Sequence, residues 1–267
     1  MLVARVGGDR IDAAAAQQRP DYRCPQCQGV VILKKGRKVI AHFAHKPPTD
    51  CTWATGETGA HLEAKFLVAQ ALNARNVKTQ IECIVTTLPG DRRAFVMAWS
   101  PKGRQIAFEL QHTAIGLDEI EHRAFSYANA GVAQIWIPFL KDSVWKEGEP
   151  RDGGWFVQRY SPRPFERWVH GFNGKNGMWM YDPTRKLFWR GRLEGHQIYV
   201  EETSWYSEGG DENYGGGFHR WSKRYKQLTL TGPYQADELR ITLESRRAFA
   251  TKDYNWPNGR IAHLTPV

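Results

Sequence analysis

One stretch of the chain, residues 92–140, limits the folds open to it, because it carries the pattern of a compact mixed unit. A short apolar segment from Ala94 to Trp99 is followed by the turn-forming sequence Ser-Pro-Lys-Gly. Residues 105–111 then alternate between apolar and polar positions, as a strand does. A helical pattern over 116–130 and an apolar run over 132–139 follow. We therefore expect two paired strands, a helix and a buried strand.

Two polar residues, Glu109 and Gln111, lie inside the second strand of this stretch. An ionised carboxylate is costly to bury unless a metal, a cation or a hydrogen-bond donor meets it. We therefore expect Glu109 to meet one of these groups, or else the strand is half exposed and its polar face contacts water. A three-residue hairpin loop would place Phe95 across from Glu109, whereas a two-residue loop would place Val96 there. The glycine that ends the turn favours the three-residue loop.

A second pattern, near the N-terminus, combines a C-x-x-C knuckle, a predicted β-hairpin and further ligand-type residues at the far end of the hairpin. This arrangement is typical of a small zinc ribbon, in which four protein ligands leave no open position for catalysis. The predicted ligands of one structural zinc are Cys24, Cys27, His45 and Cys51, with His42 as the alternative fourth ligand. The other interpretation is a pair of surface cysteines beside core histidines.

A helix is predicted over residues 56–75, where apolar residues recur at helical spacing and Thr58 is a candidate N-cap. Glu57, His61 and Lys65 are four residues apart, so they share one stripe beside the apolar face. Spacing alone also allows a solvated helix edge with one weak ion pair.

Taken in chain order, these motifs resemble the CoiA-like competence proteins of the PD-(D/E)XK nuclease superfamily. The resemblance covers residues 22–140 and includes the zinc-ribbon segment and the helix. It rests on Arg92-Arg93-x-x-Val96, Glu109-Leu110-Gln111, Arg123-x-x-x-Tyr127 and Ile135-Trp136-Ile137. It implies an α+β or α/β fold whose restriction-endonuclease-like core is a mixed sheet flanked by helices.

The resemblance also implies a chemistry. In such nucleases, carboxylates hold Mg²⁺ or Mn²⁺, which polarises the scissile phosphate and activates the attacking water. Glu109 is then the magnesium ligand. The other implied catalytic residues are Gln111, Glu57, His61 and Lys65. The implied DNA-contacting residues are Arg92, Arg93, Arg123 and Tyr127.

One departure bears directly on catalysis. The family pattern reads Arg-Arg-Ala-Asp-Val, and this chain has Phe95 where the metal-binding aspartate belongs. Asp91 lies on the same face of the strand, but about 13 Å further along it. We therefore predict weak or absent cleavage, with a gain of activity in Phe95→Asp. Three functions stay open: a metal-dependent deoxyribonuclease, a catalytically inactive DNA-binding nuclease homologue, and a zinc-ribbon adaptor protein.

The composition changes after residue 140. A polar, glycine-rich segment over 141–154 precedes a region dense in tryptophan and in basic residues, with the alternation of a β-meander. Its aromatic residues indicate either a nucleic-acid surface or the core of a small β domain. We expect an irregular tail after residue 250. The predicted domains are a zinc ribbon (1–55), a nuclease-like core (56–140) and a Trp-rich, mainly β region (141–267).

The overall charge fits a DNA partner, because 37 Lys and Arg residues against 28 Asp and Glu residues give a net charge of +9. No apolar run is long enough to span a membrane, and no secretory signal is recognisable. Four cysteines, three of them at predicted zinc positions, argue against a disulfide framework and for a cytoplasmic location. A homo-oligomer or recombination-related protein partners stay open.

Overall fold

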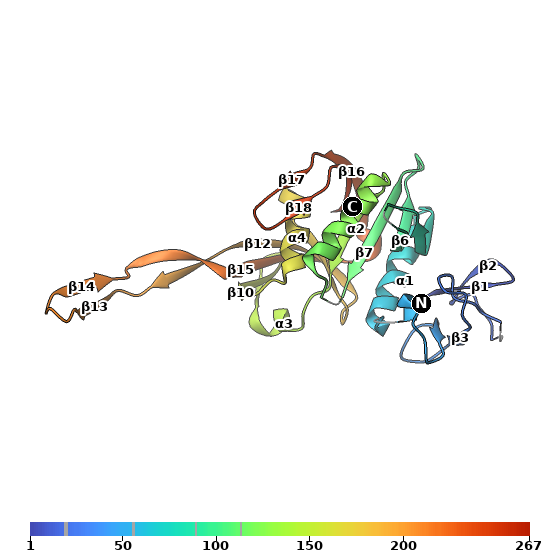
Figure 1. The fold of residues 1–267 in the computed structure, drawn as a ribbon, viewed down its shortest axis with the longest axis horizontal. Coiled ribbons are helices and arrows are strands. Elements are labelled where there is room, and N and C mark those ends of the chain that lie inside the picture. The colour runs from blue at the N-terminus through green and yellow to red at the C-terminus, as the bar shows by residue number, and fades with distance from the viewer. Residues whose placement is uncertain (19–20, 55–56, 89, 113) are drawn as a thin grey trace.

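A mixed six-stranded sheet forms the centre of the fold in the computed structural model, which describes residues 1–18, 21–54, 57–88, 90–112 and 114–267 (Figure 1). Its order is β16-β19-β8-β7-β6-β5, and β19, β8 and β7 run parallel to one another. The strands are β5 (Thr79–Val85), β6 (Arg92–Trp99), β7 (Gln105–Gln111), β8 (Ala133–Pro138), β16 (Leu239–Arg246) and β19 (Gly259–Pro266). The predicted mixed α+β class is confirmed.

Helices cover both faces of this sheet. On one face, α1 (Gly59–Ala74) packs Val68 and Leu72 against apolar residues of β7 and β8. On the other face, α2 (Leu117–Asn129) and α4 (Pro164–Asn173) share a core with Trp136. Every residue of β8 is buried, which explains why its sequence is a continuous apolar run. The predicted N-cap of α1 is confirmed, because the Thr58 hydroxyl accepts a hydrogen bond from the backbone N–H of His61.

The β6–β7 hairpin has the predicted three-residue loop. The backbone N–H of Ser100 donates to the carbonyl of Arg104 over 2.9 Å, and Gly103 has a φ of +73°. The pairing of Val96 with Phe108 continues this register. Phe95 therefore lies opposite Glu109 in the sheet.

The N-terminal part consists of two hairpins around a small apolar core. Its elements are β1 (Val3–Val6), β2 (Asp9–Asp12), β3 (Val31–Lys34), β4 (His42–His45) and the 3₁₀ turn η1 (Thr52–Ala54). Strands β3 and β4 pair antiparallel from Val31 opposite His45 to Lys34 opposite His42, as the ribbon pattern predicts.

A second sheet, of five strands in the order β11-β12-β15-β10-β9, packs beside α4. The elements are α3 (Ser143–Glu147), β9 (Glu149–Arg151), β10 (Gly154–Tyr160), η2 (Gly174–Asn176), β11 (Met178–Asp182), β12 (Leu187–Val200) and β15 (Phe218–Tyr234). Trp168, Trp179 and Trp189 are buried, as the core interpretation expects, whereas Trp205 and Trp221 are exposed. The exposed pair belongs to a long hairpin that leaves the body of the molecule (Figure 1).

The tip of this hairpin holds β13 (Thr203–Tyr206) and β14 (Glu212–Gly215), and the rest of the chain holds η3 (Ala236–Glu238), β17 (Phe249–Ala250) and β18 (Asn255–Trp256). The expectation of an irregular tail is wrong, because β19 lies between β8 and β16 in the central sheet. Two strands from beyond residue 140 thus share a sheet with the predicted nuclease-like core. The three-domain partition itself stays a prediction. No helix in the described part of the chain is long and apolar enough to cross a membrane.

Candidate functional site

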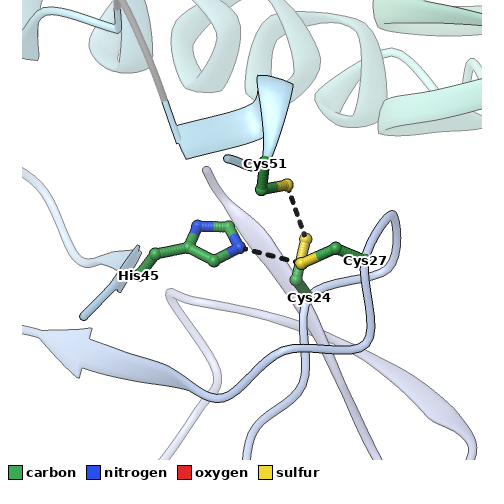
Figure 2. A group of neighbouring side chains, drawn as sticks. All are labelled: Cys24, Cys27, His45 and Cys51. Carbon is green, nitrogen blue, oxygen red and sulfur yellow. Dashed lines mark hydrogen bonds between the residues drawn. The ribbon is translucent and has the colours of Figure 1, made fainter. Parts of the chain in front are cut away.

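The predicted zinc ligands lie together. Cys24 and Cys27 come from the knuckle, His45 ends β4 and Cys51 immediately precedes η1 (Figure 2). Their ligand atoms all lie within 4.8 Å of one another. The two sulfur atoms of Cys24 and Cys51 are 3.8 Å apart, and the sulfur of Cys27 lies 3.3 Å from Nε2 of His45. Sulfur ligands at ~2.3 Å from a tetrahedral zinc would be roughly 3.8 Å apart, so the arrangement fits this metal.

The surroundings of the four ligands also suit a structural metal. Backbone N–H groups of Gln26 and Gly29 point at the sulfurs of Cys24 and Cys27, each over 3.4 Å. Burial raises the pKa of the Cys24 thiol to about 12, so a thiolate at this position needs a cation beside it. The alternative ligand His42 lies outside this group, with its Nδ1 2.9 Å from the carbonyl of Ile40. The structure therefore favours His45 as the fourth ligand.

A charged cleft of about 540 Å³ opens where the zinc-ribbon part meets the central sheet. Its lining includes Trp53, Arg92, Arg93, Phe95 and Arg123. The guanidinium of Arg93 lies over the Trp53 ring at 4.4 Å from its centroid, so the segment that follows Cys51 forms one wall. We refer to this feature as the cleft.

Phe95 lies in the middle of a row of three residues on neighbouring strands. The pairing of Ile81 with Val96 and of Cys83 with Ala94 places Glu82 of β5 on one side of it. Glu109 of β7 lies on the other side. Two cations approach the Phe95 ring: the Lys65 ammonium at 4.7 Å and the Arg123 guanidinium at 5.5 Å from its centroid. The position of the expected aspartate is therefore an aromatic ring between two ion pairs.

The Glu109 carboxylate is fully buried, and both of its oxygens are engaged. The Tyr127 hydroxyl donates to Oε1 over 2.6 Å, and the Arg123 guanidinium donates to Oε2. Burial raises the pKa of the Glu109 carboxyl, while Arg123 and the Tyr127 hydrogen bond act in the opposite direction. Burial would lower the pKa of Arg123, but the neighbouring Glu109 raises it, so we describe the two as an ion pair.

On the other side of the ring, Lys65 is fully buried between two carboxylates. Its ammonium donates to Glu82 over 3.0 Å and also donates to Glu57. Burial alone would raise the pKa of Glu57, but Lys65, the N-terminal amine and Arg93 together lower it below its ordinary value. Glu57 is thus held as a carboxylate by cations.

His61 completes the surroundings of the ring. Its imidazole packs edge-on against Phe95, with centroids 4.6 Å apart, and burial together with the nearby Lys65 lowers its pKa to about 4. At neutral pH it is therefore an uncharged aromatic neighbour. Gln111, at the end of β7, is buried and lines a hollow of about 290 Å³ with His61 and Phe95.

The predicted DNA-contacting residues differ in position. Arg92 and Arg93 line the cleft, and Arg92 lies 3.6 Å from the half-exposed Glu119. Arg123 lines it too, although its guanidinium is paired with Glu109, and the Tyr127 side chain is fully buried. The DNA-contacting role of all four stays a prediction.

The donor set around Phe95 does not suit a divalent metal. Mg²⁺ and Mn²⁺ need oxygen ligands that are free to coordinate. The oxygens of Glu109 are bound by Arg123 and Tyr127, and an ammonium lies between Glu57 and Glu82. A search of the described residues for three or more ligand-type side chains close enough to share an ion finds one group, which consists of Cys24, Cys27, His45 and Cys51.

Glu82 is the member of this cluster that the sequence patterns did not single out. Its φ of +52° within a strand is a strained conformation that costs on the order of 1–3 kcal/mol. The carboxylate compensates by accepting hydrogen bonds from the backbone N–H of Leu2 and from Lys65. One signal was available: Glu82 is a carboxylate within the apolar segment from Ile81 to Val85, as Glu109 is within its own strand.

Comparisons with known proteins agree with these features. Residues 8–54 match the family described as competence protein CoiA, N-terminal domain, and residues 57–151 match the CoiA nuclease-like domain. Competence protein CoiA of Bacillus subtilis (strain 168) is 29% identical over 121 residues. That alignment covers 45% of this chain but 32% of the relative, so the chain spans about a third of the relative's length.

A crystal structure of a protein of unknown function is also similar. It shares 15% sequence identity, with a TM-score of 0.24, and the match covers 31% of this chain and 50% of the other.

Proposed function

Because the chain belongs to the CoiA competence protein family, we propose that it binds DNA through a nuclease-like core that cleaves DNA weakly or not at all. We infer a PD-(D/E)XK arrangement for this core, built on β5 to β8 with α1 and α2. The zinc ribbon would be structural and would hold Trp53 against the cleft.

One observation carries the proposal for catalysis. Phe95 stands where the family has an aspartate, and the opposite carboxylate, Glu109, is buried with a donor on each oxygen. A metal-dependent nuclease must place a divalent ion and its water against the scissile phosphate. With one ligand absent and the other already bound by two side chains, the ion would not be held in place, and most of the rate would be lost.

DNA binding is supported by the charge and by the cleft. Arg92 and Arg93 follow one another at the start of β6 and line the cleft together. Cations that contact phosphates release counterions from DNA, which makes affinity fall steeply with salt. In this proposal the role of the cleft is to hold the phosphate backbone.

The test measures binding and cleavage on the same protein. Fluorescence anisotropy with labelled DNA over a salt series should give a negative slope of log affinity against log salt concentration. The double variant Arg92→Ala with Arg93→Ala should reduce that slope by about 2, since each phosphate contact contributes about 0.9. The matched control, Lys102→Ala with Arg104→Ala, removes two exposed cations from the β6–β7 turn and should change the slope little.

Cleavage is measured by nicking of supercoiled plasmid with Mg²⁺ or Mn²⁺. We expect no activity, or a weak activity that increases in Phe95→Asp. Efficient cleavage by the unaltered chain that Glu109→Gln abolishes would show that the core is an active nuclease. Absence of DNA binding at low salt would instead favour the zinc-ribbon adaptor.

A further inference from the structure

A β-ribbon projects from the second sheet and consists of residues 194–226, which we call the arm (Figure 1). Strand β10 pairs with β15 only as far as Tyr160 opposite Lys226. Beyond that point β12 pairs with β15 alone, and β13 with β14 at the tip. At ~3.3 Å per residue, the chain from Glu194 to Glu208 spans on the order of 50 Å.

The arm carries most of the exposed aromatic surface. In the described part of the chain, eight Phe, Tyr and Trp side chains are classed as exposed, and six of them belong to the arm. These six are Tyr199, Trp205, Tyr206, Tyr214, Phe218 and Trp221, with exposed fractions between 52% and 69%. A two-stranded ribbon is at best marginally stable in water, and its open edges favour pairing with another chain. An isolated ribbon with this many exposed aromatic side chains is typical of a surface that binds another molecule.

Two of these rings lie over glycines on the paired strand. A Cβ on Gly195 would come within 2.4 Å of the Trp221 ring, and one on Gly215 would lie 3.0 Å from the Trp205 ring. Each indole therefore packs against the backbone of a glycine, an arrangement that fixes the register of a ribbon. Both indoles remain more than half exposed, so the arm presents apolar surface near its base and near its far end.

The charges of the arm are divided along its length. Residues 195–217 contain five acidic residues and no lysine or arginine. We call the exposed acidic group the tip: Glu201, Glu202, Glu208, Asp211 and Glu212. Cations gather where the arm leaves the second sheet, and we call them the collar: Arg220, Lys223, Arg224 and Lys226. Tip and collar are of opposite sign: the collar lies at the base of the ribbon, Glu208, Asp211 and Glu212 lie at its far end, and Glu201 and Glu202 lie about midway between.

We propose that the arm binds the arm of a second copy of this chain, antiparallel, so that each acidic tip meets the collar of its partner. A two-fold axis brings the same patch of both copies together, and a patch with opposite charges at its two ends is complementary to itself in that arrangement. The exposed aromatic residues lie along the contact and would be covered by it. This inference is independent of DNA binding at the cleft.

The charge pattern distinguishes a second copy from a nucleic acid. Trp221 beside Arg220 would suit an unpaired base and its phosphate. However, Trp205, Tyr206 and Tyr214 lie among the acidic residues of the tip, where phosphates would be repelled. A second copy accounts for the aromatic residues of both regions, whereas a nucleic acid accounts for those near the collar.

The test uses the full chain and two charge-reversed variants in sedimentation experiments at low and high ionic strength. The tip variant carries Glu208→Lys, Asp211→Lys and Glu212→Lys, and the collar variant carries Arg220→Glu, Lys223→Glu and Arg224→Glu. All six residues are exposed, and circular dichroism would check that the variants fold. We expect the unaltered chain to dimerise, more weakly at high salt, and each variant to dimerise on the order of 100-fold more weakly.

Mixing the two variants gives the decisive measurement. In the mixed pair, a basic tip meets an acidic collar at one end and an acidic tip meets a basic collar at the other. A heterodimer with near-original affinity supports the proposal. A monomeric unaltered chain, variants that dimerise normally, or a mixture that stays monomeric would overturn it. Single-stranded DNA binding by a monomeric chain, lost in Trp221→Ala, would assign the arm to nucleic acid instead.

Discussion

Replacing Arg123 by methionine tests whether the charges around Phe95 are structural. The Glu109 side chain is fully buried, and the Arg123 guanidinium is the cation that binds it. Methionine keeps much of the side-chain volume but leaves the carboxylate with the Tyr127 hydroxyl alone. Breaking a buried ion pair from one side costs about 3–5 kcal/mol of the free energy of unfolding. We expect a loss of this size at pH 7.

The loss should depend on pH in a defined direction. Burial already raises the pKa of Glu109, and removal of Arg123 takes away the main opposing charge, so the pKa rises further. A carboxyl whose pKa is raised in the folded state carries no penalty below its unfolded pKa of about 4.3, where it is protonated in both states. The penalty grows as pH rises from there to the folded pKa and is constant above it. Arg123→Met should therefore be closest to the unaltered chain under acidic conditions.

Urea unfolding at several pH values would measure the difference in unfolding free energy between Arg123→Met and the unaltered chain. Arg92→Met is the surface control, because Arg92 pairs with a half-exposed glutamate and should lose less than about 1 kcal/mol. Arg163→Met is the buried comparison, since Arg163 and Tyr160 hold the fully buried Glu166 in the same way. If Arg123→Met resembles Arg92→Met, or if its loss is the same at every pH, the Arg123–Glu109 ion pair does not stabilise the fold.

Two further predictions concern the buried ligands and charges. The purified chain should contain one zinc ion, and Cys24→Ser or a chelator should unfold the N-terminal part. The control is Cys83→Ser, which lies outside the ligand group and should retain the metal. Metal analysis would measure the zinc content, and hydrogen exchange would measure the unfolding. Lys65→Met should lose about 3–5 kcal/mol in urea unfolding, because it leaves Glu82 and a second carboxylate without their cation. The exposed Lys186, 2.6 Å from Glu63, is its control, and Lys186→Met should lose less than about 1 kcal/mol.

Features set by local chemistry were predictable from the sequence. The hairpin register follows from a glycine with positive φ at the end of its turn, and it fixes Phe95 opposite Glu109. The grouping of Cys24, Cys27, His45 and Cys51 follows from the C-x-x-C knuckle and the length of the hairpin that returns His45 to it. In both cases the residues that determine the geometry are close together in the chain.

Features set by distant contacts were not predictable in the same way. Strand β19 pairs with β16 and joins the central sheet through Ile261 beside Gln134 of β8, which lies more than a hundred residues earlier in the chain. Glu82 is important because Lys65, on another element, reaches it. The arm has the alternation of an ordinary meander, and the sequence does not show that the pairing of β10 with β15 ends at Lys226.

The charges around Phe95 also explain why one substitution should not restore a nuclease site fully. Three carboxylates there pair with three side-chain cations: Glu57, Glu82 and Glu109 with Lys65, Arg93 and Arg123. The cluster therefore has little surplus negative charge to attract a divalent ion. Phe95→Asp would add one carboxylate ligand, but Glu109 would still be held by its two donors, and a second free ligand would be lacking. Recovery of efficient cleavage thus requires Glu109 to be released as well, so the gain in Phe95→Asp alone should be small.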